Sequence, residues 1–194
     1  MLCILSSFKN KIEVEKEKQR MAEERIRMEQ TQALFAPFGF DVIKFAVYAK
    51  TTLKKGKQID FGGITPDMGF RVFKGKKYVE IKFKYLVTYN TIRISSYEAA
   101  SMTFDNVVKK LAKQIIHEFE NMDDIAGFIF NVMYTNKDFL AESELPEEVI
   151  NEYVINKEPL LQYANLDITN QNLIDSSIVL VDGERIALNL QFSK

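Results

Sequence analysis

The sequence predicts an α+β fold with a mainly antiparallel sheet, and three features lead to this expectation. Apolar and polar residues alternate in several short segments after residue 40, which is typical of half-buried strands. A stripe of apolar residues at helical spacing follows at about 98–120. Near the C-terminus, two alternating segments are separated by Asp182-Gly183, which indicates a two-residue hairpin turn. Strands and helices in this order favour α+β over regular βα repeats.

The first 38 residues predict a long charged helix, and residues 39–194 predict a single α+β domain behind it. From Phe8 to about Phe35 there is no Gly or Pro, and good helix formers such as Glu, Lys, Arg, Gln and Met dominate. The apolar positions form a seam that polar residues interrupt, which is a weak coiled-coil signal. We therefore expect a tether or docking arm, with pairing to another chain as the alternative.

Residues 41–94 predict a basic β-meander. Apolar residues at 43, 45, 47 and 49 alternate with Lys and Tyr, which indicates a strand over 43–50. Further strands are expected at Phe70–Phe73 and Tyr78–Ile94, around a turn at 74–77. In the last of these, one face is apolar and the other Lys-rich, so one side of the meander should face water.

The second half of the chain predicts four more elements. Ser95 and Glu98 have the spacing of a capping box in front of the helix at about 98–120. A strand is expected near 127–135, and a short helix over 144–153 with Pro146 in its first turn. Residues 151–175 show no sustained period. The C-terminal hairpin should span 177–192.

Charge is distributed unevenly along the 194 residues. Residues 39–97 carry twelve basic and four acidic side chains, a net charge of +8, whereas residues 98–194 carry seven and seventeen, a net charge of −10. Such asymmetry suits an anionic partner for the middle segment, or two parts of one fold that attract each other. We favour the second interpretation because the acidic residues belong to the same molecule.

Motifs for catalysis, metal binding or cofactor binding are missing from the sequence. Cys3 is the only cysteine and His117 the only histidine, so neither disulfides nor a His/Cys metal set is expected. The glycine-rich stretch 62–69 matches no phosphate-binding motif and is interpreted as a connector. We expect a protein that is not an enzyme and carries no cofactor.

The Lys-rich meander is the main candidate surface for a partner or an anion. Its lysines interleave with tyrosines, which suits phosphate contacts with aromatic stacking, although lysine is also common on exposed sheet faces. The candidate residues are Lys44, Lys50, Lys54, Lys55, Lys57, Arg71, Lys74, Lys76, Lys77, Lys82, Lys84, Tyr48 and Tyr78.

The leading hypothesis is a non-catalytic interaction or assembly protein. In it the N-terminal helix tethers or pairs, and the α+β domain binds a protein partner, either itself or another chain. One alternative is nucleic-acid or anionic-surface binding through the meander. No apolar stretch approaches the roughly 20 residues of a spanning helix, and a cytoplasmic location is expected. The other alternative is an envelope-associated protein, with the apolar residues 1–5 as the end of a signal that begins upstream.

Overall fold

The computed structural model describes residues 39–54, 59–60, 67–119, 121–141 and 145–190, with scattered positions between 16 and 36. The chain divides into two compact units, Met1–Gly39 and Phe40–Lys194. Most of the predicted charged helix over residues 1–38 lies outside the described residues, and the structure does not support it as one long helix. The α+β architecture belongs to the second unit.

Helices that pack against one open sheet confirm the main features of the predicted fold class. The described elements are, in chain order, α2 (Gly39–Lys54), β1 (Ile59–Asp60), β2 (Asp67–Phe73), β3 (Lys76–Asn90), α3 (Ser96–Thr103), the π-helix η2 (Phe104–Val108), α4 (Lys109–Phe119), β4 (Gly127–Lys137), β5 (Glu147–Asn156), α5 (Lys157–Ala164), α6 (Asn170–Asp175), β6 (Ile178–Val181) and β7 (Glu184–Ile186).

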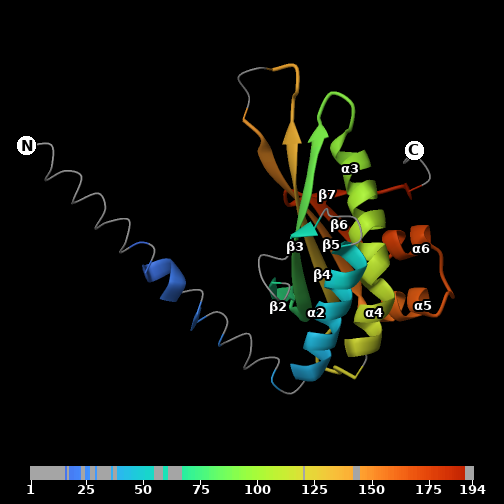
Figure 1. Ribbon diagram of the computed structural model, residues 1–194. Coiled ribbons are helices and arrows are strands. Elements are labelled where there is room, and N and C mark those ends of the chain that lie inside the picture. Colours follow the sequence, from blue (N-terminus) through green and yellow to red (C-terminus); the bar gives the residue numbers. More distant parts are fainter. Residues whose placement is uncertain are drawn as a thin grey trace, which may run out of the picture. The chain divides into compact units, whose positions relative to one another are not determined.

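The strands form one sheet in the order β1-β3-β4-β5-β6-β7, and β2 pairs with β3 on the same side as β1. Among the described strands, all pairs are antiparallel except β3 with β4. Parallel neighbours need a crossover, and here the continuous run of α3, η2 and α4 supplies it. Figure 1 shows the described helices of this unit on one side of the sheet.

The core lies between these helices and the sheet, and Phe119 of α4 joins three elements in it. Its ring makes an edge contact with Phe45 of α2 at a centroid distance of 5.9 Å, and another with Phe128 of β4 at 6.1 Å. All three side chains are fully buried. Burial of apolar side chains is the dominant favourable term in folding, and each aromatic ring contributes a large area to it.

The predicted strand over 43–50 is wrong, because these residues belong to helix α2. Phe45, Ala49 and Leu53 are buried, and their spacing of four satisfies both a strand period and a helix period. Val47 decides between the two. A strand would bury it beside Phe45, whereas in the helix its side chain points away and is 60% exposed. The meander predicted for 41–94 is therefore reduced to β1, β2 and β3.

The predicted helix over 144–153 is also wrong, because strand β5 occupies residues 147–156. Along β5 the buried side chains that face the helices are Val149, Asn151, Tyr153 and Ile155. Because Asn151 is polar, this buried row is not apolar throughout, and the sequence does not show the period of two that is typical of a strand. Two short helices, α5 and α6, follow in a stretch for which no period was apparent.

The remaining predicted elements are confirmed with adjusted bounds. Ser95 and Glu98 form the capping box: the Ser95 hydroxyl accepts from the Glu98 N–H at 3.2 Å, and the Glu98 carboxylate accepts from the Ser95 N–H at 2.9 Å. The helix at 98–120 spans α3, η2 and α4, and the strand near 127–135 is β4. Asp182-Gly183 forms the C-terminal hairpin turn, but β7 ends at Ile186 and is shorter than expected.

A cluster of polar side chains is buried inside the core, where α3 crosses β5. The Tyr153 hydroxyl lies 2.6 Å from Thr103 Oγ1 and also donates to the carbonyl oxygen of Ala100. Asn151 Nδ2 donates to Thr103 Oγ1 at 2.8 Å. The buried hydroxyl of Tyr134, in contrast, has no hydrogen-bond partner among the described residues. Two tyrosines of one core therefore differ in whether their hydroxyls are satisfied.

This difference gives a paired prediction for neutral pH. Tyr153→Phe should lower the free energy of unfolding by about 1 to 2 kcal/mol, because it leaves Thr103 and the Ala100 carbonyl with one partner fewer. Tyr134→Phe should not lower it and should raise it by up to about 1 kcal/mol, because the substitution removes a buried hydroxyl that has no hydrogen-bond partner among the described residues. Urea unfolding of the full chain would measure both. Equal losses of unfolding free energy for the two variants would contradict the conclusion that only the Tyr153 hydroxyl is hydrogen-bonded.

Candidate functional site

A groove lies on the sheet face opposite the helices. It has a volume of about 860 Å³ and lies over strands β2 to β5 and the Asp182-Gly183 turn. On β3, Ile81, Phe83 and Tyr85 are buried whereas Lys82 and Lys84 are exposed, so the Lys-bearing face carries the groove. We call this surface the sheet-face groove. It is lined by Asp67, Arg71, Glu80, Lys82, Phe83, Lys84, Asn131, Met133, Ile150, Glu152, Asp182 and Gly183.

An ion-pair network that spans four strands forms one part of the groove. Arg71 Nη1 on β2 lies 3.1 Å from Glu80 Oε1 on β3 and 2.5 Å from Glu152 Oε2 on β5. Asn131 on β4 donates to Glu80 Oε1 at 2.7 Å, and Lys82 Nζ lies 3.5 Å from Glu80 Oε2. Arg71 therefore holds two carboxylates that come from strands far apart in the sequence.

This network is partly shielded from water, which makes its geometry more defined than that of a surface pair. The side chains of Glu80 and Glu152 are only 14% and 15% exposed, and that of Arg71 is 31% exposed. Charge-assisted bonds to a guanidinium are directional, so they fix where the two carboxylates stand. Partly buried ion pairs contribute little net stability, and their main effect here is on the arrangement of charge.

The other part of the groove combines apolar side chains with exposed charges. Met133 of β4 pairs in register with Ile150 of β5, and Ile150 is 41% exposed. Lys84 Nζ and Glu148 Oε1 lie 3.3 Å apart, and both side chains are about half exposed. The result is a surface on which apolar groups lie beside charges of both signs.

The Asp182-Gly183 turn closes one end of the groove. Asp182 and Gly183 have φ values of 48° and 84°, a pair of left-handed conformations that suits this turn. The carboxylate of Asp182 accepts from the Ile150 N–H at 2.9 Å, and the Asp182 N–H donates to the Ile150 carbonyl, also at 2.9 Å. These bonds anchor the turn to β5 and place an acidic side chain at the rim.

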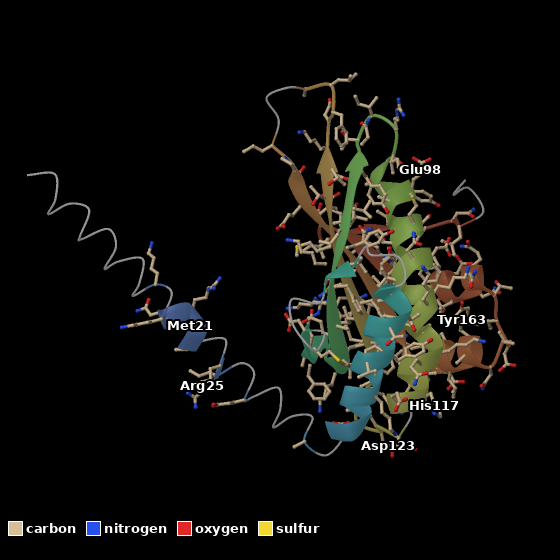
Figure 2. The ribbon with its side chains drawn as sticks, in the orientation of Figure 1. Met21, Arg25, Glu98, His117, Asp123 and Tyr163 are labelled. Carbon is tan, nitrogen blue, oxygen red and sulfur yellow. The ribbon has the colours of Figure 1, made fainter. Side chains whose placement is uncertain are left out.

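Comparison with known proteins finds no matching family model, no similar curated protein and no similar solved structure. Function must therefore be argued from the chemistry of the surface. In the part of the chain that the structure describes, no three His, Cys, Asp or Glu side chains could together hold a metal ion. His117 is exposed on α4 (Figure 2). Among the same residues, no helix is both long and apolar enough to cross a membrane.

The candidate residues from the sequence do not lie on one meander. Lys44 and Tyr48 lie on helix α2, where Lys44 is exposed and the Tyr48 hydroxyl donates to the Lys110 carbonyl at 3.4 Å. Lys50 and Lys54 belong to the same helix, and Lys55 and Lys57 lie outside the described residues. The other candidates belong to β2, β3 and the turn between them: Arg71, Lys74, Lys76, Lys77, Tyr78, Lys82 and Lys84.

Several of the sheet candidates are engaged within the molecule. Lys77 Nζ lies 2.5 Å from Asp124 Oδ2 and also 4.2 Å from the centre of the Phe70 ring. The hydrogen bond from Lys77 holds the pKa of Asp124 below its ordinary value. Tyr78 is buried, and its hydroxyl donates to Asn156 Oδ1 at 2.9 Å, so its ring is not available for stacking. Lys74 and Lys76 are exposed at the β2–β3 turn.

Sequence reasoning missed the acidic and apolar half of the groove. Alternation places Glu80 on the water-facing side of its strand with Lys82 and Lys84, and it could have placed Asn131 on the outer face in the same way. Their convergence with Arg71 depends on the parallel pairing of β3 with β4 and on the strand assignment of β5, which the residue pattern does not reveal. The residues missed are Glu80, Asn131, Met133, Ile150, Glu152 and Asp182.

Proposed function

We propose that this chain is a non-catalytic interaction and assembly protein, and that its α+β domain binds a protein partner through the sheet-face groove. The observation that carries the proposal is the arrangement of charge and apolar surface in the groove. The Arg71, Glu80 and Glu152 side chains are held in place by one another, and Met133 and Ile150 lie beside them. A role for residues 1–38 as tether or pairing element is part of the same proposal.

The composition of the groove suits a protein surface as its ligand. Protein interfaces combine an apolar centre with a polar rim and about one hydrogen bond per 100 to 200 Å². Here Ile150 and Met133 offer the apolar centre, and Lys84, Glu148 and Asp182 supply charges of both signs around it. Charges of both signs select a partner of complementary pattern rather than any anion.

Anionic-surface binding is less well supported by the contacts. Arg71, Lys77, Lys82 and Lys84 each lie within 4 Å of a carboxylate of this chain. Such neighbours reduce the positive potential that a phosphate would meet. Three of these contacts, to Glu152, Asp124 and Glu148, join the basic middle of the chain to its acidic second half.

A matched pair of substitutions tests the proposed surface. Ile150→Arg places a charge in the groove, whereas Val72→Arg makes a similar change at an exposed position of β2 that does not line it. With the full tagged chain as bait in a native extract, Ile150→Arg should reduce the quantity of each specific partner by about tenfold, and Val72→Arg should not. Equal recovery by both variants and the wild type, all with the same unfolding temperature, would refute the proposal.

A further inference from the structure

We propose that the partner of the sheet-face groove is a second copy of this chain, packed face to face about a twofold axis that runs along β4 between the two sheets. The inference rests on the proposed function, because it names the occupant of the same groove. Two sheets that pack in this way form a sandwich, with side chains of the facing surfaces interdigitating about 10 Å apart. The distribution of charge on either side of β4 leads to this arrangement.

The two sides of β4 differ in charge. On the β2–β3 side, Arg71, Lys82 and Lys84 stand against Asp67 and Glu80, a net charge of +1 from three basic and two acidic groups. On the β5–β6 side, Glu152 and Asp182 line the groove and Glu148 lies beside it, next to Lys84, which gives a net charge of −3. β4 itself contributes the uncharged side chains Asn131 and Met133.

A twofold axis along β4 converts this asymmetry into complementarity. Half a turn about an axis that is parallel to β4 and lies just above the groove brings a second sheet onto the first with its two sides exchanged. The basic side of one copy then faces the acidic side of the other. The contact is isologous, and each favourable pairing occurs twice. Complementary potentials of this kind select the partner and its orientation.

Lys84 and Glu148 are the pair through which this geometry can be tested. They come from the strands on either side of β4, and their charged atoms meet above it at 3.3 Å. Each is about half exposed, so each retains room for a second partner of opposite sign. In the proposed dimer, Lys84 of each copy would lie next to Glu148 of the other copy. The two Lys84–Glu148 pairs would then form a ring of four charges in which positive and negative groups alternate.

The apolar side chains near the axis add the non-polar part of the contact. Met133 of β4 pairs in register with Ile150 of β5, and Leu180 of β6 pairs in register with Glu152 of β5. At the axis Met133 meets its own copy, whereas Ile150, one strand away, faces the aliphatic part of Lys84 of the other copy. Ile150, which is 41% exposed in the single chain, would then lose its contact with water.

Charge-reversal variants of the full chain test the inference by sedimentation velocity at low salt. The wild type should form a dimer. Lys84→Glu and Glu148→Lys should each weaken dimerisation by at least about tenfold, because each substitution enters a symmetric contact twice. An equimolar mixture of the two variants should restore the dimer, with one copy of each. In that mixed dimer, the new carboxylate at position 84 of one copy would face the new ammonium group at position 148 of the other. The unchanged Glu148 of the first variant would likewise face the unchanged Lys84 of the second.

The mixing step separates contacts between chains from contacts within a chain. If both single variants fail to dimerise and their mixture also stays monomeric, the loss comes from the pair inside each chain and the inference is overturned. A monomeric wild type at every concentration overturns it as well. So do variants that dimerise as strongly as the wild type, since residues 1–38 or another surface then carry the association. In each of these cases the proposed function still stands if Ile150→Arg abolishes capture of a different protein.

Discussion

Gly127→Ala is expected to lower the free energy of unfolding by about 3 kcal/mol or more. Gly127 is the first residue of β4 and pairs in register with Asn156 of β5. A Cβ atom at this position would lie 2.1 Å from the carbonyl oxygen of Ile155 and 2.8 Å from Cα of Asn156. Both are backbone atoms, so relief requires the strands to separate at the β4–β5 pair in the middle of the sheet.

Gly69→Ala in β2 is the matched control, and chemical denaturation of the full chain is the measurement. A Cβ atom at Gly69 meets nothing within 4 Å, and alanine costs less conformational entropy than glycine in a strand. Its free energy of unfolding should stay within about 1 kcal/mol of the wild type. Similar losses for the two variants would show that the close approach at Gly127 is not the cause.

Part of the fold could be predicted because local signals agreed with the tertiary environment. The capping box at Ser95 and Glu98 depends only on residues three apart, and the Asp182-Gly183 turn depends on two residues that tolerate left-handed backbone. Phe128, Phe130, Val132 and Tyr134 of β4 occupy alternate positions because the helices cover that face of the sheet, although Ile129 and Met133 make the other face apolar in part. In these places local preference and packing demand the same residue types.

The two errors arose where the pattern satisfied more than one structure. In α2 the buried positions are four apart, which fits either period, and the apolar Val47 at the surface made a strand look complete. In β5 the buried row contains Asn151, which the core accepts because Thr103 Oγ1 accepts a hydrogen bond from its side chain. A residue pattern records polarity, but it does not record which remote partner satisfies a polar group.

The candidate site was only half predictable for the same reason. Lysines on the water-facing side of β3 were recognisable from alternation, and Arg71 was among the candidates. Glu152 lies 81 residues after Arg71, and Glu148 lies 64 residues after Lys84. Both counter-charges come from a strand that the pattern assigned to a helix. A surface that the sequence presents as basic is therefore, in the folded chain, one of mixed charge.

Stability at alkaline pH should depend strongly on buried tyrosines, and Tyr134→Phe should reduce that dependence. Burial, with a smaller effect from the nearby Asp182 carboxylate, raises the pKa of Tyr134 to about 12. Burial also raises the pKa of Tyr89 and of Tyr153. A raised pKa in the folded state means that the folded chain retains protons which the unfolded chain loses above about pH 10. The stabilisation is therefore complete below about pH 10 and is lost as pH rises towards about 12.

The size of the effect follows from the shift at Tyr134. Between about pH 10 and pH 12, the wild type should lose about 2 to 3 kcal/mol of its free energy of unfolding through this residue alone, at about 1.4 kcal/mol per pH unit. Tyr134→Phe has no such proton to lose, so its curve against pH should fall less steeply by that amount. Tyr48→Phe, which removes a hydroxyl at the partly exposed surface of α2, is the control variant. Urea unfolding at a series of pH values would measure this difference in the pH dependence of the free energy of unfolding. Parallel curves for the wild type and Tyr134→Phe would mean that the Tyr134 hydroxyl is not buried in the folded chain.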